Sequence, residues 1–137
     1  ISEGPPKMRT TPKSVTYEKS FAFAIRVVKA YKWLCESQKE YVLSKQLLRS
    51  GTSIGANVKE GLYAQSKRDF ITKLTIALKE AAESEYWIEL LSAGQYLDKK
   101  TAASMLEDIS EIMKLLTASV KTAKAGIKDA GNGNENA

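Results

Sequence analysis

The stretch AASMLEDISEIMKLLTASVKTAKAGI, residues 102–127, has the most regular apolar spacing in the chain. Apolar residues recur there at alternating intervals of four and three, the repeat that keeps side chains on one face of an α-helix. The series is Ala102, Leu106, Ile109, Met113, Leu116, Val120, Ala123 and Ile127. A helix with this apolar face must bury it against other elements, so the stretch predicts a packed helix.

Three segments before it also have helical spacing, and none alternates as a strand would. The predicted helices cover residues 16–38, 42–64 and 67–96, and the last one begins at an N-cap on Thr101. Ser66 is the predicted N-cap of the third helix, because a serine hydroxyl can accept a hydrogen bond from the backbone N–H of Asp69. Long amphipathic helices with short connections predict an all-α fold, an up-down-up-down four-helix bundle.

The two ends of the chain lack this spacing. All three prolines fall within residues 1–15, and the chain closes with GNGNENA. We predict a disordered N-terminal arm over residues 1–15, a helical bundle over 16–129 and a disordered tail over 130–137.

The predicted core follows from the same spacing. In the first helix the predicted seam is Tyr17, Phe21, Ala24, Val28, Tyr31 and Cys35, widened by Ile25, Val27 and Leu34. In the third helix the core residues are Phe70, Leu74, Ala77, Ala81, Ile88 and Leu91. Cys35 is interpreted as a small hydrophobic residue on its helix.

The second helix contains RSGTSIGANVKEG, residues 49–61, whose glycines could suggest a phosphate-binding loop. On a helical wheel, however, Leu47, Ile54 and Val58 stay on one face across these glycines, which indicates a helix. Glycine inside a helix costs roughly 0.5–1 kcal/mol relative to alanine. Gly51 and Gly55 therefore predict a close approach to another helix.

The opposite face of this helix is polar, with Arg49, Ser53 and Glu60 aligned and Asn57 beside them. It can be a solvated surface or a subunit interface, and we favour the interface. On the third helix Lys73, Glu80, Glu83 and Trp87 share one flank, so Arg49 is predicted to pair with Glu80 or Glu83, within the chain or across a subunit boundary. Trp87 is interpreted as an interface anchor.

Composition argues against most enzyme classes. The chain has no histidine and one cysteine, and it has no Walker-type phosphate loop, so the usual catalytic and zinc-binding sets are missing. A di-metal site built on Glu60, Glu80 and Glu83 would also lack its histidines. We predict a protein that is not an enzyme and has no cofactor or metal; a carboxylate enzyme is the alternative.

The net charge is +5, and residues 1–66 carry eleven Lys/Arg against five Asp/Glu. The predicted nucleic-acid contacts on the first helix are Lys19, Arg26, Lys29 and Lys32. Lys19, Arg26 and Lys29 recur at spacings of seven and three, which predicts one exposed strip. A solvated helix face accounts for the same charges. No apolar run reaches the ~20 residues that span a bilayer, no signal-peptide pattern opens the chain and there is one cysteine, which together predict a cytoplasmic protein without a membrane partner. No small-molecule substrate is expected, because the usual catalytic sets are missing.

The stretch RSGTSIGANVKEG resembles the signature of the four-helix-bundle proteins encoded in 23S rRNA intervening sequences (S23 ribosomal protein-like), approximately Arg-Arg-Ala-x-x-Ser-Ile-x-Ala-Asn-Ile-x-Glu-Gly. The matching positions are Arg49, Ser53, Ile54, Ala56, Asn57, Glu60 and Gly61. The similarity continues through ALKEAAESEYWIELL and covers residues ~17 to 120, whereas Gly51 and Gly55 replace the more usual Ala and Pro.

The resemblance implies a left-handed bundle that forms a homo-oligomer, a ring of five. The accessory protein of diversity-generating retroelements is similar in fold to this family, and there a basic ring surface engages nucleic acid. The expected function is therefore that of a non-enzymatic homo-oligomer that acts as an adaptor for RNA or DNA. The alternative is an assembly module that binds only protein.

Overall fold

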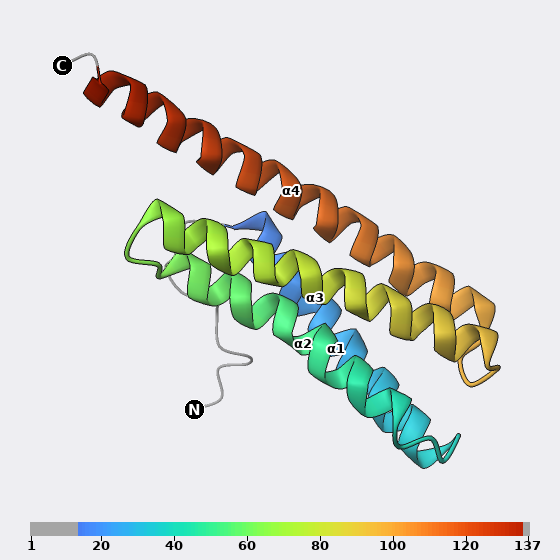
Figure 1. Cartoon of the computed structure of the whole chain (residues 1–137). Helices are drawn as coiled ribbons and strands as arrows, with labels where there is room; N and C mark the ends of the chain where they lie inside the picture. Colours follow the sequence, from blue (N-terminus) through green and yellow to red (C-terminus); the bar gives the residue numbers. More distant parts are fainter. Residues whose placement is uncertain (1–13, 136–137) are drawn as a thin grey trace, which may run out of the picture.

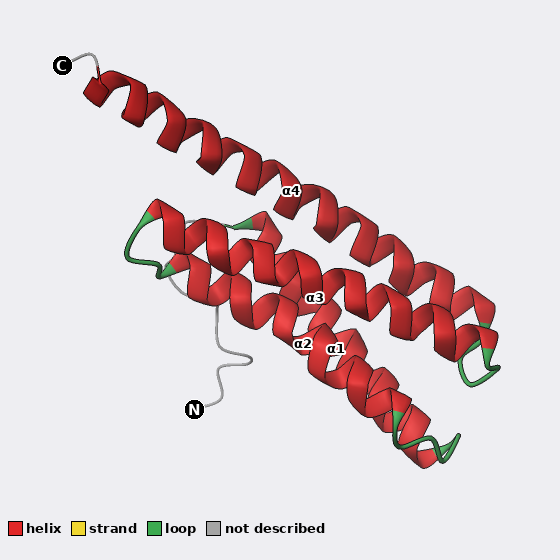
Figure 2. Cartoon of the chain, in the orientation of Figure 1, coloured by secondary structure: helices red, strands yellow, loops and turns green. Residues whose placement is uncertain are grey.

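The computed structural model describes residues 14–135, with side chains through Lys128. Four helices cover most of this range: α1 (Val15–Glu36), α2 (Leu43–Leu62), α3 (Lys67–Ala93) and α4 (Lys99–Glu135). Short loops join them, and no strand occurs among residues 14–135 (Figure 2). The protein is therefore all-α, as its sequence predicts.

The helices pack in the order in which they follow one another in the chain. Contacts join α1 to α2, α2 to α3, α3 to α4, and α4 back to α1. With 37 residues, α4 is much longer than the 20-residue α2, and its C-terminal end extends past the other helices (Figure 1).

Most helix boundaries lie within two residues of the predicted ones, and side-chain caps explain where two of them begin. The hydroxyl of Ser14 accepts a hydrogen bond from Tyr17 N (3.0 Å), so α1 starts at Val15. Ser66 accepts from Asp69 N (3.1 Å), which confirms the predicted cap of α3. At the other end, α3 stops at Ala93, three residues earlier than predicted.

The predicted start of the last helix is wrong. The carboxylate of Asp98, not the side chain of Thr101, caps it: Asp98 Oδ2 accepts a hydrogen bond from Thr101 N (2.9 Å). Lys99 and Lys100, predicted as part of the connection, therefore form the first residues of α4. Asp and Thr are both good N-caps, which is why the sequence alone placed the cap three residues too late.

The predicted arm and tail are only partly within the described range. Residues 1–13 and 136–137 lie outside it, so most of the arm is not described. The helical bundle begins at Val15, one residue before the predicted limit of 16. The helix α4 continues to Glu135, six residues past the limit of 129 that we predicted for the bundle.

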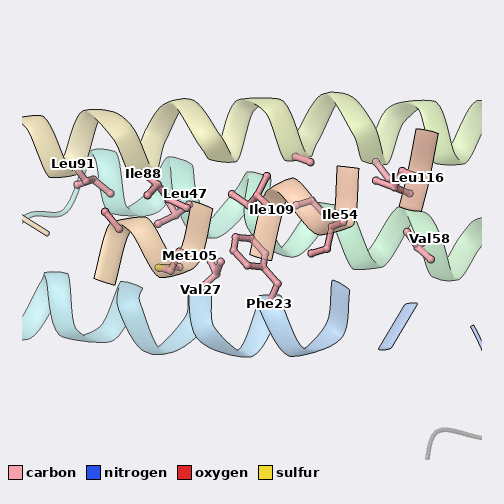
Figure 3. Close-up of a cluster of buried hydrophobic side chains, with 14 of the residues drawn as sticks. Phe23, Val27, Leu47, Ile54, Val58, Ile88, Leu91, Met105, Ile109 and Leu116 are labelled. Atoms are coloured by element: carbon pink, nitrogen blue, oxygen red, sulfur yellow. The ribbon is translucent and has the colours of Figure 1, made fainter. Parts of the chain in front are cut away.

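The core is a single apolar cluster to which all four helices contribute (Figure 3). In the predicted stripe of α2, Leu47, Ile54 and Val58 are buried, and the flanking Leu43 and Leu62 are half-buried. Five of the six core residues predicted in α3 are buried, and the sixth, Phe70, is half-buried. Burying a Leu, Ile or Phe side chain stabilises the folded state by roughly 1.5–3 kcal/mol. The fully buried side chains that dominate this contribution include Phe23, Leu34, Leu47, Ile54, Ile88, Leu91, Met105, Ile109, Ile112 and Leu116.

The predicted seam of α1 is wrong, although Val27 and Leu34, two of the three residues predicted to widen it, are buried. The buried residues of α1 are Ser20, Phe23, Val27 and Leu34. In the predicted seam, Phe21 and Val28 are instead 48% and 41% exposed, while Tyr17, Ala24, Tyr31 and Cys35 are only half-buried. The helix carries apolar side chains on two adjacent stripes, and the bundle buries the one that contains Phe23.

The predicted seam of α4 is half right. Ala102, Ile109, Leu116 and Ala123 are buried, but the intervening Leu106, Met113, Val120 and Ile127 are half-buried. Met105 and Ile112, which the prediction omitted, are 1% exposed. The apolar face of α4 is wider than one stripe, and the bundle turns it toward Met105 and Ile112.

The two glycines predicted for close packing differ in how tightly they are enclosed. A Cβ on Gly51 would lie 2.7 Å from Val27 Cγ2, so α1 and α2 approach too closely there for any side chain on Gly51. A Cβ on Gly55 would lie 3.6 Å from Ser20, an ordinary contact. The predicted close packing of two helices therefore requires a glycine at position 51 but not at position 55.

Candidate functional site

The polar residues of the family signature and their partners on α3 lie together on one surface, which we call the motif face. It comprises Arg49, Ser53, Asn57 and Glu60 of α2 with Glu80, Glu83 and Trp87 of α3. The register of α2 produces this arrangement, because burial of Leu47, Ile54 and Val58 turns the opposite, polar side of the helix outward.

Arg49 is the centre of the motif face. Its Nη1 donates to Glu80 Oε2 (3.3 Å), its Nη2 donates to Glu83 Oε2, and its Nε contacts Gln46 Oε1 (3.4 Å). The indole Nε1 of Trp87 donates to the same Glu83 oxygen (2.9 Å). The predicted pairing of Arg49 with Glu80 or Glu83 is thus present, with both carboxylates, inside one chain.

The remaining signature side chains also have partners within the chain. Asn57 Nδ2 donates to the carbonyl of Ser53 (2.8 Å), and the Ser53 hydroxyl donates to the carbonyl of Arg49 (2.7 Å). Glu60 pairs with Lys73 Nζ (2.9 Å). A Cβ on Gly61 would lie 2.7 Å from Leu74 Cδ1, so this signature glycine permits close packing of α2 on α3.

Behind the motif face, two buried serines join α2 to α3. The hydroxyls of Ser50 and Ser84 are hydrogen-bonded at 2.8 Å, and Ser84 Oγ also lies 2.9 Å from the carbonyl of Glu80. Small side chains at these positions let the two helices approach closely. They thereby hold Arg49 within reach of the α3 carboxylates.

The motif face is not arranged as a metal site. Within the part of the chain whose side chains are described, no group of three or more His, Cys, Asp or Glu residues could hold a metal ion. Glu80 and Glu83 are both directed to Arg49, and Glu60 is directed to Lys73.

Exposed apolar side chains surround the motif face on the α3 side. Ile76 and Leu90 lie seven residues before and after Glu83, so the three share one line along α3. Both are exposed, and so is Tyr86, whose ring packs edge-on against Trp87 with centroids 5.0 Å apart. Aromatic and arginine side chains beside apolar ones are the composition of interface centres.

A second apolar surface lies on α1, and we call it the α1 outer patch: Phe21, Ile25 and Val28. Their spacing of four and three places them on one stripe that faces away from the core. Tyr17 extends it, because its ring centroid lies 6.1 Å from that of Phe21. Lys59 Nζ lies over the rings of both Tyr17 and Tyr63, at 5.1 and 5.9 Å from their centroids. Contiguous exposed apolar surface of this kind marks interaction sites.

The predicted basic strip on α1 is divided by the structure. Lys19 pairs with Glu111 (2.9 Å), and Arg26 pairs with Asp108 (2.7 Å), so both cations lie against α4 with an acidic partner. Lys29 and Lys32 are exposed and form no ion pair with a described residue. Of the predicted strip, Lys19 and Arg26 are thus held against α4 and Lys29 is exposed, and nucleic-acid contact by these residues stays a prediction.

Sequence reasoning missed a row of lysines on α4. Between Glu111 and Asp129 the chain has no acidic residue, and four lysines are exposed there: Lys114, Lys121, Lys124 and Lys128. Lys114, Lys121 and Lys128 are spaced by seven and so share one side of the helix. The signal was present in the sequence as a heptad repeat of lysine.

No helix in the described part of the chain has the length and hydropathy needed to cross a membrane.

The model of the 23S rRNA-intervening sequence protein family matches residues 13–118. No curated protein matches the chain. Among solved structures, a protein of unknown function from the S23 ribosomal protein family of Bacteroides thetaiotaomicron is 54% identical, with a TM-score of 0.77, over 78% of this chain and 99% of that one. The family match covers both the motif face and the α1 outer patch, and the chain belongs to the 23S rRNA-intervening sequence protein family.

Proposed function

We propose that the protein is a non-enzymatic, self-associating adaptor. The observation that carries this proposal is the α1 outer patch. Phe21, Ile25 and Val28 are 48%, 43% and 41% exposed and follow one another along a single helix stripe. A helix whose second apolar stripe faces solvent in one chain can bury it against another copy of the chain.

The motif face is the second surface that we assign to assembly. A ring requires two different, complementary surfaces on each subunit, since each copy contacts one neighbour with one surface and the next neighbour with the other. The α1 outer patch is one such surface, and the motif face with Ile76 and Leu90 is the other. The family resemblance favours a ring of five copies. It also favours a left-handed, up-down-up-down arrangement of the helices, which the short loops support.

The test is the mass of the assembly, measured by light scattering for the wild-type chain and two variants. Phe21→Glu should disable the α1 outer patch, and Leu90→Glu should disable the apolar flank of the motif face. Each variant alone should be reduced to monomers with unchanged helicity by circular dichroism. Tyr96→Ser, at an exposed position outside both surfaces, is the control and should keep the wild-type mass.

Mixing the two variants sharpens the test. Phe21→Glu retains its motif face and Leu90→Glu retains its α1 outer patch, so an equimolar mixture should form heterodimers and nothing larger. An interface in which the α1 outer patch binds its own copy would leave Leu90→Glu assembled and give no heterodimer. A monomeric wild-type chain would refute the proposal.

Nucleic-acid binding is a second candidate function, supported by the lysine row of α4. Its four exposed lysines lie along one helix without an intervening acidic residue, and assembly would multiply them. Such a surface neutralises phosphates without reading bases, so its affinity should fall steeply with salt. Fluorescence anisotropy with a single-stranded RNA at about 50 and 200 mM salt tests it. Absence of binding at the lower salt would leave the protein-binding function alone.

A further inference from the structure

A pocket of about 450 Å³ lies between α1 and the N-terminal end of α4, away from the motif face. We call it the Trp33 pocket. Its lining includes Arg26, Lys29 and Trp33 of α1, Leu97 of the preceding loop, and Thr101 and Met105 of α4. Its volume is in the range of pockets that hold small organic ligands.

The pocket combines an apolar floor with an exposed aromatic side chain. Leu97 and Met105 are 4% and 1% exposed, so they form part of the packed core, while the side chain of Trp33 is at the surface. An indole ring exposed next to apolar side chains offers a face on which a second planar ring can stack. The shape and chemistry therefore suit a flat aromatic group.

Two cations line the same pocket. Arg26 is fixed in place from α4, because its Nη1 donates to Asp108 Oδ2 (2.7 Å) and contacts Ser104 Oγ (3.1 Å). Lys29 is exposed and pairs with no described carboxylate. The one carboxylate in the lining, Asp98, accepts a hydrogen bond from Thr101 N (2.9 Å), and hydrogen bonds from the Thr101 backbone and side chain lower its pKa and keep it charged. An anionic group therefore meets the free ammonium of Lys29, beside a guanidinium whose charge is shared with Asp108.

We propose that the Trp33 pocket binds a nucleotide, with the base stacked on Trp33 above Leu97 and the phosphate held by Lys29 and Arg26. The hydroxyl of Thr101, which donates to Asp98, can still accept a hydrogen bond from the sugar. A nucleotide carries both a planar base, which suits the apolar side of the pocket at Trp33, and an anionic phosphate, which suits the basic side at Lys29. None of the lining residues belongs to the motif face or to the α1 outer patch, and on α4 the site lies at Thr101 and Met105, N-terminal to the lysine row of Lys114–Lys128.

The experiment is calorimetric titration of the full chain with AMP, adenosine and inorganic phosphate. AMP should bind more tightly than either part alone. Base-on-aromatic stacking is worth about 1–3 kcal/mol, so Trp33→Leu should weaken AMP binding on the order of 10-fold or more. Lys29→Ala should weaken AMP binding without changing the affinity for adenosine. The controls are Trp87→Phe, which leaves Trp33 in place, and Lys45→Ala, an exposed lysine of α2 outside the pocket.

Two outcomes would overturn the proposal: no heat from AMP at millimolar concentration, or equal AMP affinity in the wild type and Trp33→Leu. A ten-residue single-stranded RNA distinguishes the source of the nucleotide. Competition between this RNA and AMP means that the pocket accepts a base within a strand, whereas no competition means a free nucleotide. The mass of each sample is measured in parallel, so a failure of assembly is recognised separately from a failure of the pocket.

Discussion

Gly51 lies directly against Val27: a methyl group on its α-carbon would be 2.7 and 2.9 Å from the two γ-carbons of that valine. Val27 is fully buried and β-branched, so its side chain has little freedom to rotate away. The α1–α2 distance at this level of the bundle is therefore set by the absence of a side chain at Gly51.

Gly51→Ala should consequently destabilise the protein, by roughly 1–3 kcal/mol, which is the usual cost of overpacking a core. Gly55→Ala is the matched comparison, because its new methyl group would have only ordinary contacts at 3.6 Å. It should be neutral or stabilising by up to about 1 kcal/mol, from the higher helix propensity of alanine. Urea unfolding of both variants checks this, and equal midpoints for the two would contradict it.

Glu40 provides a prediction on pH. Its carboxylate lies before α2, is 8% exposed, and accepts hydrogen bonds from the N–H groups of Val42, Leu43 (both 3.0 Å) and Ser44 (2.6 Å). Burial by itself would raise the pKa of Glu40, but the hydrogen bonds from Leu43, Ser44 and Val42 outweigh burial and lower it below the ordinary value of 4.5. The charged form is therefore favoured by folding.

A carboxyl group with a lowered pKa in the folded state stabilises that state above its unfolded pKa and loses this contribution as pH falls through the folded pKa. Glu40→Gln should thus cost on the order of 1 kcal/mol at pH 7, the scale of a helix cap. The difference from wild type should shrink below about pH 4.5. Thermal unfolding at pH 7 and pH 3.5 measures this. Glu89→Gln, at an exposed position of α3, is the control, and a difference that is constant with pH would contradict the assignment.

The paired serines give a third prediction. The hydroxyls of Ser50 and Ser84 are both fully buried and are hydrogen-bonded to each other. Ser84→Ala removes one partner and should cost about 1–2 kcal/mol, because it leaves a buried hydroxyl with a poorer partner, the Leu47 carbonyl at 3.5 Å. The double variant Ser50→Ala/Ser84→Ala should lose less than the sum of the two single changes. Additive losses in a double-mutant cycle would mean that the pair is not coupled.

The sequence predicted the second helix best, because one apolar stripe and one polar face leave a single orientation for it. The first helix was oriented wrongly for the opposite reason. It has two apolar stripes, through Phe23 and through Phe21, and their spacing does not show which one its own bundle buries. The pairing of Arg26 with Asp108 was also beyond sequence reasoning, because these residues are 82 positions apart and meet only through the packing of α1 on α4.

The last prediction concerns which helix would bind RNA. If RNA binds through the lysine row of α4, replacing Lys121, Lys124 and Lys128 with glutamine should lower affinity. With a single-stranded RNA, the three replacements should also reduce the slope of the logarithm of the binding constant against the logarithm of the salt concentration. The reduction should be about 2, since each of the three lost phosphate contacts contributes about 0.7. The control variant Lys45→Gln/Lys79→Gln, at exposed positions of α2 and α3, should change the slope little, whereas Lys29→Gln/Lys32→Gln tests the strip predicted on α1. A large effect of the α1 change with no effect of the α4 change would place the site on α1 after all, as the sequence alone predicts.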